Sequence, residues 1–280
     1  MLEIGRINTL QVYKEVSFGL YLDGGEAGEI LLPKRYIPEG TRVQDWLDVF
    51  IYLDSEDRLI ATTETPKVMV DECAFLKVVS VTPVGAFLDW GLPKDLLVPF
   101  NEQDRPMVVG RSYVVVVALD DATNRIIASS RLQDYLDEEA DEHISVGQKV
   151  DLLVSGHTDL GYKAVINSDY IGLIFANETF RELRPGTELS GYVKTIRPDG
   201  KIDLRIDPGK ETVVDTLSET ILRHLSNNGG TSQLTDKSPP EAIYRSFGVS
   251  KANYKRALGR LYKQKKILIT AEEISLNEAT

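Results

Sequence analysis

A threefold repeat constrains the fold of this chain more than any other feature of its sequence. Each copy places a glycine inside an apolar segment, at Gly19, Gly85 and Gly161, and these glycines are 66 and 76 residues apart. After each glycine the chain runs through a turn, a second apolar segment and a late segment with a basic residue. That spacing is the size of one small antiparallel barrel, and short strands separated by regular turn signals are typical of barrels and sandwiches.

Local signals support strands rather than helices in the first 210 residues. The segment 111–119 is rich in β-branched residues and short for a buried helix, so it predicts a strand. Asn167-Ser168-Asp169, between two apolar runs, predicts a hairpin turn. Gly110, Gly147 and Gly186 each precede an apolar run and predict turns into strands.

The repeats resemble the S-one (S1) domain, an RNA-binding module with the five-stranded OB fold. Its signature couples Phe-Gly-x-Phe on one strand with an acidic and a basic residue on a later one. The first repeat has Phe18-Gly19-Leu20-Tyr21, with Asp54 four residues before Arg58. The resemblance implies three barrels in series.

The second and third repeats depart from this signature. The second keeps Phe87 and Arg125, with Asp121 four residues before Arg125, but has Val84 at the first aromatic position. In the third repeat, the aromatic positions hold Leu160 and Lys163, and the acidic and basic positions hold Arg197 and Lys201.

Aromatic and basic residues of the repeats are candidate RNA contacts, because an exposed ring can stack on a base while a nearby cation meets a phosphate. Core packing is the alternative for the rings: Phe18 and Tyr21 face opposite sides of a regular strand unless Gly19 bends it. A solvated face is the alternative in the third repeat, where Tyr170 is a further candidate. The candidates are Phe18, Tyr21, Arg58, Phe87, Arg125, Tyr162, Lys163, Lys194, Arg197 and Lys201.

The last 70 residues predict a winged-helix domain. Apolar spacing predicts a helix over 212–228, and Ser238-Pro239-Pro240-Glu241 reads as a capping box for a short second helix that ends at Gly248. Ser250 is the predicted cap of a third helix, whose inward face would be Tyr254, Ala257 or Leu258, and Leu261. The segments 267–270 and 274–276 predict the wing hairpin.

Charge separates this domain from the repeats. The chain carries a net charge of −11, which divides into −14 for residues 1–211, +6 for residues 212–270 and −3 for residues 271–280. A basic surface attracts phosphates, and the candidate contacts on the third helix are Lys251, Lys255, Arg256 and Lys263. The alternatives are a solvated face or docking onto the acidic barrels.

The string 236–243, together with Ser250-Lys251 and residues 254–263, resembles the C-terminal domain of the conserved virulence factor B family. The resemblance implies a multidomain, mainly β chain with S1-type domains at 1–66, 67–141 and 142–210 and a winged helix at 211–280. It implies RNA binding, control of gene expression after transcription, and no catalysis. Gly259 lies inside the third predicted helix, where glycine costs about 1 kcal/mol relative to alanine. We interpret it as a close backbone contact, for which packing against the protein is the first interpretation and a ligand is the alternative.

An enzyme is disfavoured, since no phosphate-binding glycine loop, nucleophile elbow or metal-ligand spacing occurs. We expect no cofactor and no metal. Neither an apolar run of membrane-spanning length nor a signal peptide is evident, and the single Cys73 cannot form an internal disulfide, so we expect a cytoplasmic protein. We expect a monomer that binds single-stranded RNA, with uridine-rich RNA as one candidate. The alternatives are a DNA-binding winged-helix regulator and a protein-binding scaffold.

Overall fold

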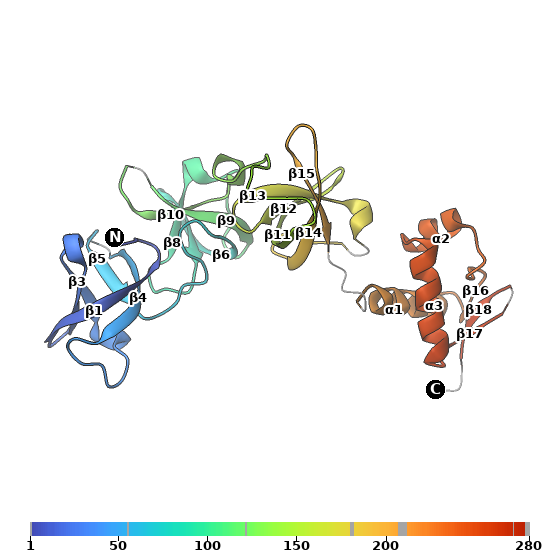
Figure 1. Ribbon diagram of the computed structural model, residues 1–280, viewed down its shortest axis with the longest axis horizontal. Coiled ribbons are helices and arrows are strands. Elements are labelled where there is room, and N and C mark those ends of the chain that lie inside the picture. The colour runs from blue at the N-terminus through green and yellow to red at the C-terminus, as the bar shows by residue number, and fades with distance from the viewer. Residues whose placement is uncertain are drawn as a thin grey trace.

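A computed structural model describes residues 2–54, 56–120, 122–179, 182–206, 212–270 and 272–277, without the side chains of residues 212–216. Three barrels follow one another in a row, and the C-terminal domain lies at the end of the row opposite the first barrel (Figure 1). Each of these four folded units lies inside one of the ranges predicted from the sequence. The boundaries themselves stay predictions.

All three barrels have five strands connected in the same way. The first is β1 (Ile7–Val16), β2 (Gly19–Asp23), β3 (Glu29–Pro33), β4 (Trp46–Leu53) and β5 (Leu59–Thr62). The second is β6 (Cys73–Thr82), β7 (Gly85–Asp89), β8 (Leu96–Pro99), β9 (Ser112–Leu119) and β10 (Ile126–Ser129). The third is β11 (Lys149–Thr158), β12 (Gly161–Ile166), β13 (Tyr170–Phe175), β14 (Glu188–Ile196) and β15 (Ile202–Ile206).

In each barrel the third strand pairs in parallel with the fifth, and this pairing closes the sheet. The other neighbouring strands are antiparallel. The predicted fold class is confirmed, and it holds for the third repeat although its signature is the weakest.

The repeated glycine is required by the approach of the second strand to the third. A Cβ atom at Gly19 would lie 2.3 Å from the carbonyl oxygen of Leu32 on β3. At Gly85 and Gly161 it would lie 2.2 and 2.1 Å from the equivalent carbonyl oxygens of β8 and β13. No side chain fits at such distances, so the close pairing of the second and third strands requires the repeated glycine in every barrel.

The second and third barrels share a buried apolar interface. On β9, Tyr113, Val115 and Val117 point into the second barrel, whereas Val114 and Val116 point out of it. The outward pair is buried against residues of β11, β12 and β13. Both faces of β9 are therefore buried, which explains a continuous apolar run where a strand with one wet face would alternate.

The first and second barrels meet in a similar way through β4. Val49 and Ile51 face the core of the first barrel, and Phe50 and Tyr52 join the core cluster of the second. The Phe50 ring stacks on Tyr52 at 6.0 Å and meets Trp90 edge-on at 5.7 Å. Burial of these large rings joins the first barrel to the second, as the outer face of β9 joins the second barrel to the third.

The C-terminal domain contains the expected three helices and wing. Its elements are α1 (Thr212–Asn227), β16 (Thr231–Ser232), α2 (Pro240–Phe247), α3 (Lys251–Lys263), β17 (Ile267–Ile269) and β18 (Ile274–Leu276). The predicted hairpin β17–β18 gains a third strand, because the two-residue β16 pairs with β18. Short strands of polar residues carry no periodicity, so β16 had no sequence signal.

Two of the predicted helix boundaries are confirmed and one predicted cap is wrong. Gly248 ends α2 in the left-handed conformation, and the Ser250 hydroxyl accepts a hydrogen bond from the backbone N–H of Asn253 at the start of α3. The predicted capping box is not formed. The Ser238 hydroxyl accepts from the N–H of Thr235 instead, which leaves Pro239 as the N-cap residue.

Candidate nucleic-acid interface

The two signature rings of the first barrel are close together on its surface. Tyr21 points outward from β2, between Leu20 and Leu22, which are buried. Phe18 precedes the strand in a turn and is 55% exposed, so strand alternation does not apply to it. The ring centroids are 6.3 Å apart and the rings meet at 84°. Both rings are therefore accessible from one side.

Tyr13 and Lys14 extend this surface. The pairing of β1 with β2 shifts register between Val12 and Lys14, and the bulged Tyr13 is 58% exposed. The Lys14 ammonium lies 4.7 Å from the centroid of the Tyr21 ring and 5.7 Å from that of Tyr13. We call Tyr13, Lys14, Phe18 and Tyr21 the first-barrel platform. It combines three rings with one cation, as base-stacking surfaces do. The Lys14 ammonium is also ion-paired with Glu29 at 2.6 Å, so a phosphate must compete with that carboxylate.

The signature pair of the first barrel forms a tight ion pair. The Arg58 guanidinium donates to a carboxylate oxygen of Asp54 at 2.8 and 3.0 Å and also meets Glu56 at 3.0 Å. Burial alone would raise the pKa of the Asp54 carboxyl, but hydrogen bonds from Arg58 and from the Glu56 backbone outweigh it and lower that pKa. The charge of Arg58 is thus largely balanced by its own barrel.

In the second barrel the candidate residues line a groove of about 340 Å³ beside the first barrel. Phe87 occupies the position of Tyr21, facing outward, and Arg125 lies on the same groove. Arg125 forms an ion pair with Asp57 of the first barrel. Its expected partner Asp121 lies outside the described residues.

In the third barrel, a groove of about 380 Å³ brings together Leu160, Lys163, Arg197 and Lys201. The Arg197 guanidinium donates to Asp203 at 2.5 and 2.8 Å. The other cations are looser: Lys163 lies 3.8 Å from Glu138, and Lys201 has no ion pair within the described part of the chain. Lys194 does not line this groove and is ion-paired with Glu178 at 2.6 Å.

The expectation for the third-barrel tyrosines is corrected. Tyr162 occupies the inward position next to Gly161 and is 8% exposed, within the barrel core. Tyr170 is also buried, and its hydroxyl donates to Asp141 at 2.5 Å. Neither ring is available to stack on a base.

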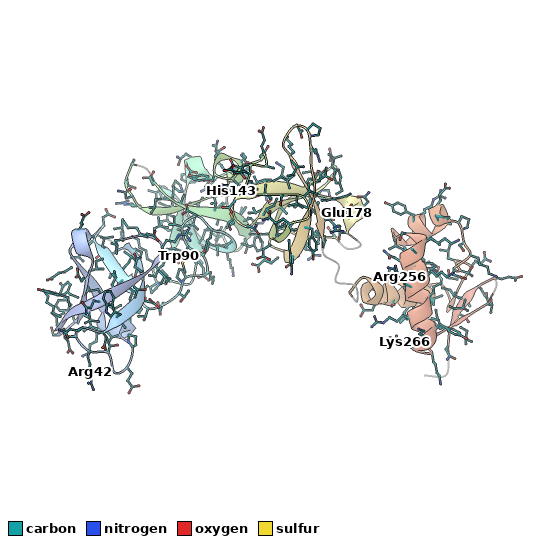
Figure 2. The ribbon with its side chains drawn as sticks, in the orientation of Figure 1. Arg42, Trp90, His143, Glu178, Arg256 and Lys266 are labelled. Atoms are coloured by element: carbon teal, nitrogen blue, oxygen red, sulfur yellow. The ribbon has the colours of Figure 1, made fainter. Side chains whose placement is uncertain are left out.

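The third helix of the winged-helix domain carries five cations and no acid over Lys251–Lys263. Figure 2 labels Arg256 on this helix. The Lys251 ammonium donates to the Lys237 carbonyl at 3.3 Å, and Lys255 lies 3.9 Å from Asp236. Arg256 and Lys263 have no ion pair in the described ranges. Arg256 and Lys263 are consequently freer than the barrel arginines to meet a phosphate.

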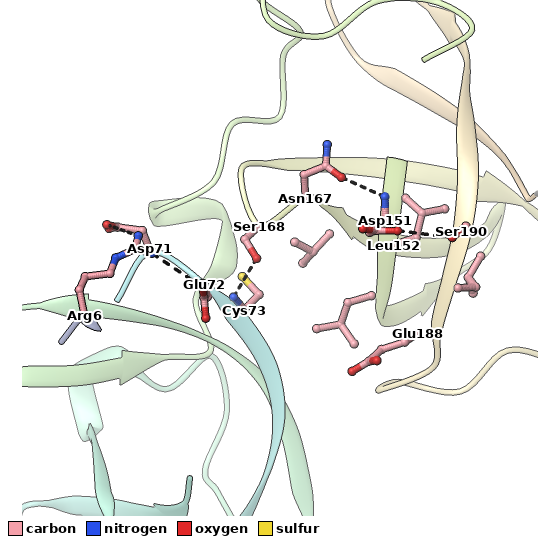
Figure 3. A pocket seen from close by; sticks show the side chains of 13 residues that line it. Arg6, Asp71, Glu72, Cys73, Asp151, Leu152, Asn167, Ser168, Glu188 and Ser190 are labelled. Atoms are coloured by element: carbon pink, nitrogen blue, oxygen red, sulfur yellow. Dashed lines mark hydrogen bonds and ion pairs between the residues drawn. The ribbon is translucent and has the colours of Figure 1, made fainter. Parts of the chain in front are cut away.

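A cavity of about 920 Å³ between the second and third barrels has the opposite character (Figure 3). Asp71, Glu72, Asp151 and Glu188 line it, and its one cation, Arg6, is ion-paired with Asp71 at 3.0 Å. A phosphate would be repelled here. The described residues hold no group of three or more histidine, cysteine or acidic side chains suited to a metal ion, and none of their helices is long and apolar enough to cross a membrane.

Comparison with known proteins agrees with this domain order. Residues 4–64 match the S1 domain family model, and residues 219–276 match that of the CvfB-like winged helix domain. The chain is 30% identical to Bacillus subtilis YitL, over 94% of this chain and 90% of that protein. It is also 30% identical to conserved virulence factor B of Staphylococcus aureus, over 82% of this chain and 78% of that protein. The chain belongs to the conserved virulence factor B family.

The domains of this virulence factor B homologue support nucleic-acid binding. The S1 barrel has the OB fold and the winged helix is related to the helix-turn-helix, and both folds commonly bind nucleic acids. A solved structure with 24% identity is described as a multidomain protein with nucleic acid binding domains from Streptococcus pneumoniae. The match covers 98% of both chains with a TM-score of 0.44.

Proposed function

We propose that this virulence factor B homologue is a non-enzymatic protein that binds single-stranded RNA and regulates bacterial gene expression after transcription. It acts in the cytoplasm, where its RNA partner is found, as a monomer. The observation that carries the proposal is the first-barrel platform, in which Tyr13 and Phe18 are exposed and Tyr21, half-buried, lies against both Phe18 and Lys14.

The platform favours single strands over duplexes. Stacking on an aromatic side chain contributes about 1–3 kcal/mol per base, and it requires a base whose face is not covered by pairing and stacking within a duplex. Uridine-rich RNA is the proposed preference, because pyrimidine runs leave the backbone flexible and the bases free. The grooves of the second and third barrels add Phe87, Arg125, Lys163, Arg197 and Lys201 as proposed contacts.

The cations of α3 complement the platform. We call Lys251, Lys255 and Arg256 the α3 triplet. They lie within residues 212–270, which carry a net charge of +6, whereas residues 1–211 carry −14. Lys263 lies about two helical turns beyond Arg256 on the same helix. We propose that α3 supplies the sequence-independent attraction to phosphates and that the platform selects unpaired bases.

A binding titration of the full chain tests the proposal. A labelled uridine-rich RNA of about 12 nucleotides is compared with duplex DNA of the same length, at salt between about 50 and 200 mM. The proposal expects tighter binding to RNA, with affinity that falls as salt rises. Equal or tighter duplex binding would favour a DNA-binding regulator, and binding to neither would favour a protein-binding scaffold.

A further inference from the structure

Gly259 lies in the middle of α3 without a structural reason for being glycine. Apart from the backbone of α3 itself, no heavy atom of the described residues would lie within 4 Å of a Cβ atom at this position, so no described part of the chain packs against the helix there. The interpretation of Gly259 as a packing contact is therefore wrong. Glycine stabilises a helix less than alanine does, and no described contact at Gly259 offsets that loss of helix stability.

The surface around Gly259 is cationic and partly aromatic. Residues three and four positions away are neighbours on a helix, and here they are Lys255, Arg256, Tyr262 and Lys263. The first two and the last are exposed cations, and the Tyr262 ring is 56% exposed. The buried face of α3 is formed by other residues, among them Tyr254 and Leu261. Gly259 is thus a low point on the helix surface with cations on both sides.

We infer that Gly259 is the point at which the sugar–phosphate backbone of a bound RNA strand crosses α3. The inference rests on the proposed function and adds a contact site to it. The missing Cβ lets the strand approach the helix backbone closely, as glycine does at other ligand contacts. Phosphates on either side then lie within reach of Arg256 and Lys263, and Tyr262 can stack on an adjacent base.

Charge identifies the occupant as a polyanion rather than a protein surface of mixed charge. The candidate arginines of the barrels, Arg58, Arg125 and Arg197, are each ion-paired with an aspartate. Arg256 and Lys263 have no such partner within the described ranges, and α3 holds no acid. Unpaired cations flanking an open backbone suit a chain of phosphates.

The experiment measures RNA affinity and thermal stability together, in the full chain, for Gly259→Ala and Gly259→Leu. Both replacements favour the helix, so the winged-helix domain should melt at the same or a higher temperature. Affinity for the uridine-rich oligonucleotide should nevertheless fall, by about tenfold for Gly259→Leu, which corresponds to 1.4 kcal/mol. The affinity of the Gly259→Ala variant should lie between those of Gly259→Leu and the wild type.

Ser246→Leu on α2 is the matched control, because it adds a leucine to another exposed helical position of the same domain. It should leave the affinity unchanged. If wild-type protein binds the RNA and Gly259→Leu binds it equally well, the contact at Gly259 is disproved while the proposed function stands. If the wild-type protein does not bind RNA, the proposed function fails and the inference fails with it.

Discussion

Removal of the Phe18 ring separates base stacking from electrostatic attraction. Phe18 is 55% exposed and meets Tyr21 in a T-shaped arrangement, so Phe18→Ala should change the free energy of unfolding by no more than about 0.5 kcal/mol. Loss of stacking on one base costs about 1–3 kcal/mol of binding, which raises the Kd by about 5- to 140-fold. The expected change is thus large in affinity and small in stability.

Fluorescence anisotropy with the uridine-rich oligonucleotide over a series of salt concentrations measures the affinity and its dependence on salt. The ring carries no charge, so Phe18→Ala should lower affinity equally at every salt concentration and leave the slope of log K against log salt unchanged. Phe100→Ala is the matched control: Phe100 is 53% exposed in the second barrel and lies away from the platform. An equal loss from both variants, or a slope altered by Phe18→Ala, would refute base stacking at the platform.

Three further predictions concern charge, packing and the cysteine. Alanine at all three positions of the α3 triplet should weaken RNA binding more than Phe18→Ala combined with Tyr21→Ala. The triple variant should also lower the slope of log K against log salt by about 2, because three phosphate contacts on a single strand are lost. A larger loss of affinity from the ring pair in matched titrations would reverse this ranking. Phe50→Ala should lower the unfolding free energy of the barrels by about 3–5 kcal/mol in denaturant titrations, because the ring is fully buried between two barrels. An unfolding curve like that of Phe100→Ala would show that the interface contributes little to stability. Burial raises the pKa of the Cys73 thiol to about 12 and so disfavours the reactive thiolate. The native protein should therefore react with iodoacetamide at pH 8 far more slowly than the denatured protein. Equal rates would mean that the barrels separate freely.

The barrel fold was predictable because its constraints are local. The glycine of each repeat is imposed by close backbone approach and recurs in every copy. The positive φ of the turn before the fourth strand leaves a glycine only in the second and third barrels, at Gly110 and Gly186, whereas the first barrel has Gln44 there. The packing of barrel on barrel was not predictable. A run such as Val114 to Val117 indicates that both faces of a strand are buried, but the sequence does not say which surface covers the outer face.

The candidate site was predictable where it follows the signature and missed where it depends on an irregularity. Phe18 and Tyr21 were found from the motif, whereas Tyr13 reaches the platform through a bulge that has no sequence pattern of its own. The inward position of Tyr162 follows from the register of the repeats. The residue after the repeat glycine is Leu20 in the first barrel and Ala86 in the second, both core residues, and the same register predicts an inward Tyr162.

The division of charge along the chain has a consequence for how it would hold RNA. On the barrels, a phosphate must compete with the aspartate already bound to each candidate arginine, and the net charge of the first 211 residues opposes its approach. The α3 cations act only over the Debye length, about 8–10 Å, so they hold a strand that touches the helix and do not draw one onto the distant platform. Barrels and winged helix would each bind weakly alone. Because one chain carries both, a strand held by α3 meets the platform at a high effective concentration, and the two weak affinities combine. An RNA long enough to reach both surfaces should therefore bind much more tightly than one that fits either, and this length dependence would distinguish joint binding from binding at a single site.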